Sequence, residues 1–167
     1  ASWAGGGIVS PLYPWRYSMP ISRLSRWSEG FSPELSLRLL EETGIDPEYR
    51  QKGLLYLRVE DADKALDWAH SVGKPLERVD ADFLYAKEPN AAPGFESALW
   101  MPTLGSIRNP RLGQALRSRL AAMPHVELRE GVGAERLLVE RGRIIGAESR
   151  HERFSAGQVI VCGGAWA

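Results

Sequence analysis

Three consecutive glycines near the start of the chain have the type and spacing that best allow close contact with a ligand. They lie within SWAGGGIVSP, residues 2–11. Glycine has no side chain, so its backbone can adopt positive φ and let a ligand approach closely. The run is not a phosphate-binding loop, because the one Gly-Lys pair, Gly73-Lys74, is followed by Pro75 and lacks the upstream glycine. Taken alone, the run indicates either a ligand-contacting loop or an unusually glycine-rich turn.

A second glycine cluster, Gly163-Gly164, follows the apolar run Val159–Cys162. An apolar strand that ends in two glycines would place backbone N–H groups at the carboxyl edge of a sheet. In open α/β folds, nucleotide phosphates and riboses bind at that edge. Many strands also end in a plain glycine turn, so both interpretations stay open for this cluster by itself.

The other residues that could carry chemistry form no recognisable catalytic set. The three histidines, His70, His125 and His151, are far apart and have no partner at metal-ligand spacing, so no metal site is predicted. Cys162 is expected to be a small buried apolar side chain. Gly-x-Ser-x-Gly, Cys-x-x-Cys and His-Glu-x-x-His do not occur, so hydrolase chemistry has no visible machinery. The carboxylates assigned to solvated helix faces or caps are Glu41, Glu42, Asp61 and Asp63.

The six tryptophans divide into two groups by their surroundings. Trp27, Trp68 and Trp100 fall in expected helices or strands, which favours packing. Those beside glycine or proline in loops, where a ring either flanks a ligand or packs, are Trp3, Trp15 and Trp166.

The composition is that of a globular protein of one domain, or of two small pieces sharing a core. Apolar residues make up 44% of the 167 residues and charged residues 25%. The net charge is zero, which removes the electrostatic argument for nucleic acid or an anionic membrane surface. No apolar run is long enough to span a bilayer, and a single cysteine fits a reducing, cytoplasmic compartment. Both ends look cut, which favours the middle of a longer protein over a trimmed complete domain.

Two helices and a strand are expected in the first third of the chain. Residues 22–30 have apolar side chains at helical spacing. A second helix begins at Ser32 as N-cap with Pro33 in the first turn, and it ends at Gly44 as C-cap. Residues 53–59 are rich enough in aromatic and branched side chains to form a strand.

The rest of the chain mixes helices and strands. We expect helices over residues 62–71 and 80–86 and a strand over residues 97–101, with a continuation at Ile107 after Gly105. A helix capped by Asn109, with Pro110 in its first turn, runs to Pro124. Four strands follow, over residues 126–129, 135–140, 143–148 and 158–162. Arg141-Gly142 is expected to form a tight hairpin turn between the second and the third of them. This order predicts a mixed α/β (α+β) protein and not a simple doubly wound domain.

Three motifs in order resemble those of flavin amine oxidases of the D-amino-acid oxidase superfamily. Residues 2–11 are similar to the S-x-A-(A/G)-(A/G)-G loop, with the closer likeness to glycine oxidases of the thiamine-biosynthesis type. The helix start at residues 109–112 and the strand VELRE at residues 126–130 resemble the helix and V-x-L-x-E strand that follow. Residues 159–166 are similar to the later strand V-V-L-A-A-G-A-W. The likeness covers essentially the whole chain.

This resemblance implies the central part of an FAD-binding, glutathione-reductase-like domain with an inserted substrate domain on a mixed or antiparallel sheet. Residues 1–44 and 125–167 would belong to the FAD-binding domain and residues 45–124 to the substrate (cap) domain. Ala134 would contact the adenine through its backbone, at a position where the family commonly has valine. The residues implied to contact FAD are Ser2, Trp3, Ala4, Gly5, Gly6, Gly7, Ile8, Ala134, Gly163, Gly164 and Trp166.

The implied activity is FAD-dependent oxidation of the amine of glycine or a small amino acid to an imine, with O2 reduced to H2O2. A D-amino-acid dehydrogenase, a sarcosine oxidase and a non-catalytic structural or binding fragment remain as alternatives. The family's G-x-G-x-x-G would precede Ala1, and its substrate-clamping arginine would follow Ala167, so catalytic residues are unassigned and the chain alone is expected to be inactive. The expected partner is a small amino-acid substrate, without nucleic acid or a membrane span, and a homo-oligomer is left open.

Overall fold

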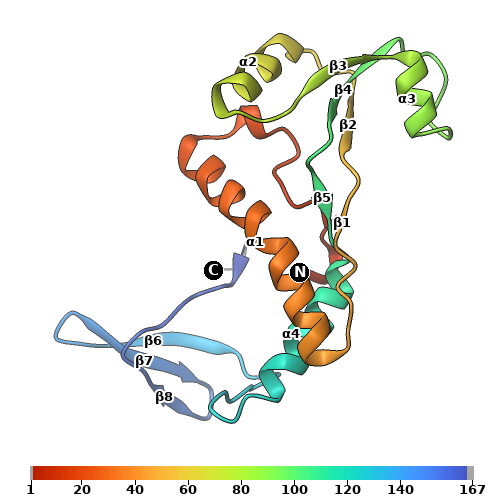
Figure 1. Ribbon diagram of the computed structural model, residues 1–167. Coiled ribbons are helices and arrows are strands. Elements are labelled where there is room, and N and C mark those ends of the chain that lie inside the picture. Colours follow the sequence, from red (N-terminus) through yellow and green to blue (C-terminus); the bar gives the residue numbers. More distant parts are fainter. Residues whose placement is uncertain (1, 165–167) are drawn as a thin grey trace. The chain divides into compact units, whose positions relative to one another are not determined.

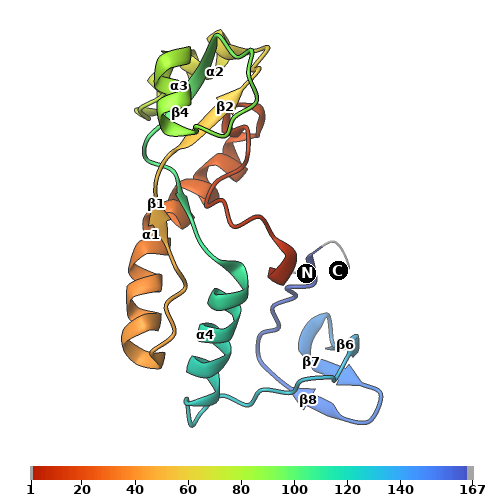
Figure 2. The same cartoon turned by 90° about the vertical axis from the view of Figure 1, so that its right-hand side faces the viewer.

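The computed structural model describes residues 2–164, and the chain divides after Pro124 into two compact units, which are described separately (Figure 1). The first unit contains two short 3₁₀ turns, η1 (Ser2–Ala4) and η2 (Pro14–Arg16), and four α-helices. These are α1 (Met19–Thr43), α2 (Ala62–Val72), α3 (Ala81–Lys87) and α4 (Asn109–Ala121). Helices α1 and α4 lie side by side in both views (Figures 1 and 2).

Two small antiparallel sheets complete the first unit. Strands β1 (Arg50–Gln51) and β5 (Gly105–Ser106) form a two-stranded pair. Strand β4 (Ser97–Met101) lies between β2 (Leu54–Leu57) and β3 (Glu77–Asp80) in a three-stranded sheet. The predicted strand over residues 97–101 is therefore confirmed, and the one predicted over residues 53–59 is shorter than expected. Strands β1 and β3 were missed, since both are short and polar.

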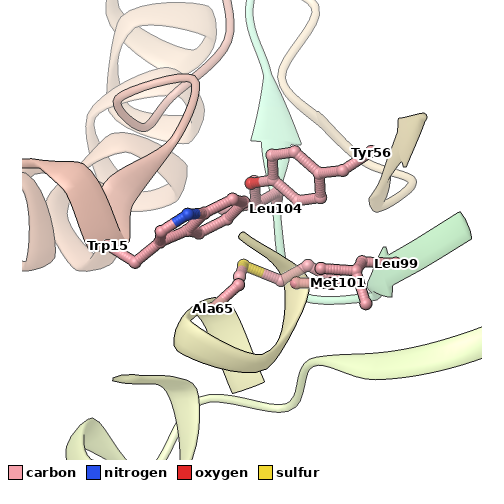
Figure 3. Packing of buried hydrophobic residues seen from close by; sticks show 7 residues of the cluster. Trp15, Tyr56, Ala65, Leu99, Met101 and Leu104 are labelled. Atoms are coloured by element: carbon pink, nitrogen blue, oxygen red, sulfur yellow. The ribbon is translucent and has the colours of Figure 1, made fainter. Parts of the chain in front are cut away.

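The two faces of β4 carry two separate apolar clusters. Leu99 and Met101 point to one side, and Ala98 and Trp100 to the other, because successive side chains of a strand alternate. The first cluster, part of which Figure 3 shows, brings loop, sheet and helix residues together. Its buried members are Trp15, Tyr56, Ala62, Ala65, Leu99, Met101 and Leu104. Strand β4 is thus the central element of this unit.

Helix α1 corrects the expectation of two helices broken near residue 31. The helix runs unbroken through Pro33, and the Ser32 hydroxyl donates to the carbonyl of Ser28 instead of capping a new helix. That hydrogen bond uses a hydroxyl within the helix, as serine can do when it bonds to the preceding turn. The predicted C-cap is confirmed: Gly44 has φ +69° and its N–H donates to the carbonyl of Leu40 at 2.8 Å.

The other helix predictions are confirmed with shifted ends. Helix α2 matches residues 62–71 with one residue added, and α3 begins after Asp80, whose carboxylate accepts from the Phe83 N–H at 2.9 Å. Helix α4 begins one residue earlier than expected, so Arg108 occupies the N-cap position and the assignment of Asn109 as cap is wrong. It ends at Ala121, before Pro124.

The second unit is an antiparallel meander of β6 (Ala134–Glu140), β7 (Arg143–Ser149) and β8 (Arg153–Ser155). The predicted hairpin turn is confirmed, with positive φ at Arg141 and Gly142. Residues 126–129 and 158–162 are not strands, and β8 was not predicted. An apolar run forms a strand only beside a partner, and in the described part of this unit residues 158–162 pair with none, leaving Ile160 84% exposed.

The mixed α/β class with antiparallel sheets is confirmed. Among residues 2–164, no helix is both long and apolar enough to span a bilayer.

Candidate functional site

The glycine run lies beside strand β5 and is held there by backbone hydrogen bonds. Ile8 forms an isolated antiparallel bridge with Ser106. The Ile107 N–H donates to the carbonyl of Gly7 at 2.8 Å, and the Val9 N–H donates to the carbonyl of Gly105 at 3.0 Å. These bonds hold the loop beside the junction between β5 and α4, so its conformation is set by the sheet and not by the loop alone.

Two of the three glycines, Gly6 and Gly7, have different surroundings. Gly7 has φ +78°, and a Cβ there would overlap the backbone carbonyl oxygen of Ile107. The close approach at Gly7 is therefore to the protein's own strand. Gly6 has no atom within 4 Å of the position where a Cβ would stand, so this glycine leaves open space. Only the open part of the run is free to accept a ligand against its backbone.

An open cavity of about 400 Å³ lies beside this open part. Gly5 and Gly6 line it from one side, and residues 106–110 together with Glu48 and Arg50 line it from the others. The charged side chains in its wall are already paired. The Glu48 carboxylate accepts from Arg108 Nη1 at 3.2 Å, and Arg50 Nη2 donates to Asp46 at 3.2 Å.

The backbone of this wall is also constrained. Glu48 has φ +58°, and its N–H donates to Asp46 Oδ1 at 2.7 Å. That bond is the largest cause of the lowered pKa of Asp46, with a further contribution from Arg50. Three guanidinium groups, those of Arg50, Arg108 and Arg111, thus pair with the two carboxylates of Asp46 and Glu48, so each carboxylate is held by arginine and positive charge is in slight excess. Such a wall suits a planar cofactor that brings its own chemistry.

The structure places the predicted site residues in both units. Ser2, Trp3 and Ala4 form η1, with the Trp3 side chain 73% exposed, and they lead directly into the glycine run. The predicted residues from Ser2 to Ile8 thus form one continuous segment of the first unit.

The remaining predicted site residues belong to the second unit. Ala134 begins β6, pairs with Ser149 and lines a small cavity of about 200 Å³ with Val132 and Phe154. Gly163 is exposed, and Gly164 has φ +59°. They do not end a strand, so the expectation of a sheet edge there is wrong. Trp166 lies outside the described residues.

The structure also shows how buried the other candidate residues are. Trp15 is only 4% exposed and belongs to the core, so its ring packs against other side chains and is not available to contact a ligand. Cys162 is exposed, so the expectation of a buried cysteine is wrong, because the segment around it pairs with no strand among residues 2–164. The three histidines are exposed. Within residues 2–164, no group of three or more His, Cys, Asp or Glu side chains could hold a metal ion.

Asp61 is the residue whose role the sequence pattern did not reveal. One of its carboxylate oxygens accepts from Trp15 Nε1 at 2.9 Å and from Arg16 Nε at 3.0 Å, and the other accepts from Arg16 Nη2. The hydrogen bond from Arg16 is the largest cause that lowers the pKa of Asp61 to about 2. The partners are about 45 residues away in the chain. No local spacing signals such a pair, and only the proximity of Asp61 to a helix start was visible.

Comparison with known proteins assigns the family. Residues 1–167 match the family of FAD-dependent oxidoreductases. The chain is 43% identical over 166 residues to glycine oxidase from Pseudomonas putida and 42% identical to glycine oxidase from Pseudomonas aeruginosa. Each match covers 99% of this chain and 46% of the relative, so the chain spans about half the length of these relatives.

Solved structures agree with that assignment. Glycine oxidase from Geobacillus kaustophilus superposes with a TM-score of 0.86 at 27% identity, covering 100% of this chain and 46% of that one. Glycine oxidase from Bacillus cereus gives a TM-score of 0.82 at 25% identity, covering 99% of this chain and 47% of that one. On its sequence match and its fold, the chain belongs to the family of FAD-dependent oxidoreductases.

Proposed function

We propose that the chain is part of an FAD-dependent oxidase that converts the amine of glycine or a small amino acid to an imine, with O2 reduced to H2O2. The observation that carries this proposal is the open backbone at Gly6 beside the cavity at β5, in a loop whose sequence resembles the flavin-contacting loop of the family. The 43% identity to a glycine oxidase supports glycine as the first substrate to test. We also propose a cytoplasmic location, from the single cysteine.

The domain assignment is part of the same proposal. Residues 1–44 and 125–167 contribute to the FAD-binding domain, and residues 45–124 form the substrate domain. Residues 2–8 contact the cofactor mainly through their backbone. Contacts of the adenine and ribose regions with Ala134, Gly163, Gly164 and Trp166 rest on the resemblance of their motifs to the family.

The residues of this chain would then hold and orient the cofactor. FAD, when bound, supplies the electron acceptor for hydride transfer from the amine α-carbon. Gly7 fixes the loop beside β5, Gly6 leaves open space next to the backbone, and Gly5 and Gly6 both line the cavity. The Glu48 carboxylate is held by Arg108 and Arg111, and Arg50 is held by Asp46. Because the Glu48 carboxylate is already paired with arginine, we assign it no role as a base, and the substrate would arrive as the neutral amine or lose its proton elsewhere.

A D-amino-acid dehydrogenase is the second candidate. The chain is 28% identical over 171 residues to a D-amino acid dehydrogenase from Cereibacter sphaeroides, covering 95% of this chain. Such an enzyme would form the same imine and pass electrons to an acceptor other than oxygen.

The test uses the purified full-length protein that contains this chain. We expect visible flavin absorption, and peroxide release on addition of glycine, compared with sarcosine and D-alanine. Bleaching of the flavin by an amine without peroxide formation in air would favour the dehydrogenase. A protein that holds no flavin, or whose flavin no amine reduces, would overturn the proposal. We further expect the 167-residue chain alone to bind FAD weakly and not to turn over, and a flavin-loaded preparation of that chain would contradict this.

A further inference from the structure

The segment that follows the glycine run is held at two points. Its first anchor is β5, through the bonds of Gly7 and Val9 to residues 105–107. Its second anchor is the start of α2, through the bonds of Trp15 and Arg16 to Asp61. Both anchors lie in residues 45–124, the proposed substrate domain. The loop and that domain are therefore fixed to one another at both ends of a segment of about ten residues.

The second anchor is built from a buried ring and a stacked cation. Trp15 packs edge-on against Tyr13 and Tyr56, with ring centroids 5.5 Å and 5.2 Å away (Figure 3 shows Trp15 and Tyr56). Arg16 lies over the Tyr13 ring at 4.3 Å. A buried indole N–H needs an acceptor, and the Asp61 carboxylate provides it. The same carboxylate orients the Arg16 guanidinium through two parallel bonds.

The other end of α2 is attached to α1. Arg26 Nη2 donates to the carbonyl of Val72 at 2.8 Å, and Lys74 pairs with Glu29 where both side chains are largely buried. Helix α2 is therefore joined at both ends to residues 1–44. Loss of the Asp61 anchor would remove the polar link between the start of α2 and the Trp15–Arg16 turn, while the packing of Trp15 against Ala62 and Ala65, the β5 anchor and the α1 contacts would remain in place.

We propose that Asp61 is a positioning residue, which fixes the substrate domain relative to the flavin-contacting loop through Trp15 and Arg16. This inference rests on the proposed function. The β5 anchor alone holds the loop that contacts FAD, so removal of the Asp61 anchor should leave cofactor affinity nearly intact. The rate of flavin reduction should fall, because hydride transfer requires the amine and the flavin to be held in close and defined geometry.

The test compares Asp61→Asn with Asp63→Asn in the full-length flavin-containing protein. Asp63 lies two residues away on the same helix, is 94% exposed and bonds only to Arg78 among the partners described for it, so its substitution makes the same chemical change away from the loop. A third variant, Asp61→Glu, keeps the charge. The measurements are the rate of anaerobic flavin reduction by saturating amine, the FAD dissociation constant and the thermal midpoint.

For Asp61→Asn we expect the reduction rate to fall by on the order of tenfold to a hundredfold, as a displacement near 1 Å can cause. We expect the FAD dissociation constant to change by less than about threefold, because the backbone bonds on β5 remain. Asp63→Asn should match the wild type, and Asp61→Glu should lie closer to the wild type than Asp61→Asn does.

Two results would overturn the positioning role. One is an unchanged reduction rate in Asp61→Asn. The other is a rate that falls only in proportion to the flavin lost, which indicates a general loss of structure. A wild-type protein that no amine reduces would instead refute the proposed function, so the two failures are distinguishable.

Discussion

Substitution of Gly7 by alanine tests whether the glycine run is fixed by the sheet. With φ at +78°, a non-glycine residue at position 7 costs about 1–2 kcal/mol in backbone energy. The new Cβ would also overlap the Ile107 carbonyl oxygen, so the loop must move and lose its two bonds to residues 105–107. Each such bond contributes about 0.5–1.5 kcal/mol net, which brings the expected loss in free energy of unfolding to about 2–5 kcal/mol.

The matched control is Gly6→Ala, one residue away. Its Cβ would enter open space and its φ lies outside the left-handed region, so the expected change is within about 0.5 kcal/mol. The assay is urea unfolding of the 167-residue chain, followed by tryptophan fluorescence, since Trp15 and Trp100 are buried in the first unit. A Gly7→Ala chain as stable as the wild type, or a Gly6→Ala chain as unstable as Gly7→Ala, would refute this reasoning.

Four further predictions concern stability. Gly113→Ala, on an exposed position of α4 with open space around it, should raise the free energy of unfolding by about 0.5–1 kcal/mol, and a loss on urea unfolding would contradict this. Arg141→Asn should stabilise the hairpin by about 0.5–1 kcal/mol because Arg141 has φ +49°, which thermal unfolding of the variant can check. Leu84→Ala should cost about 2–5 kcal/mol, as its side chain is fully buried, and a smaller loss in chemical denaturation would show that the site collapses. The pKa of Asp61 is lowered to about 2, below its ordinary value, so its contribution to stability is present above about pH 4 and lost as the pH falls toward 2. The difference in urea midpoint between the wild type and Asp61→Asn should therefore shrink between about pH 4 and pH 2. A constant difference would count against the pair with Arg16.

Local patterns predicted the elements whose determinants lie within a few residues. The short apolar run over residues 97–101 was expected to be a strand, and β4 buries both of its faces in two apolar clusters. The spacing of Ala62, Ala65 and Ala69 identified α2, whose buried face they form. Gly44 ended α1 because a glycine readily adopts the left-handed conformation that closes a helix. In each case the physical cause is visible in a short window.

Features that depend on distant partners were not predictable in this way. Pro33 was expected to begin a helix and lies inside one, where the Ser32 hydroxyl bonds to the preceding turn. Residues 158–162 have the composition of a strand, yet a strand also requires a neighbour.

The candidate site shows the same limit. The glycine run was identified from its residue types, but the different roles of Gly6 and Gly7 depend on where Ile107 lies. Asp61 was assigned to a helix cap, and its bonds to Trp15 and Arg16 come from a segment about 45 residues earlier.

The most direct test of the cofactor site is the FAD dissociation constant of the full-length apoprotein with a side chain added at Gly6. Gly6→Val is compared with Gly30→Val, a matched change on α1 at a position that is also open. If the open backbone at Gly6 contacts the flavin, Gly6→Val should weaken FAD binding by about tenfold or more without lowering the stability of the apoprotein, since about 1.4 kcal/mol of lost contact corresponds to tenfold. Gly30→Val should bind FAD as the wild type does. Equal FAD affinity of Gly6→Val and the wild type would contradict the assignment of the glycine run to the cofactor site.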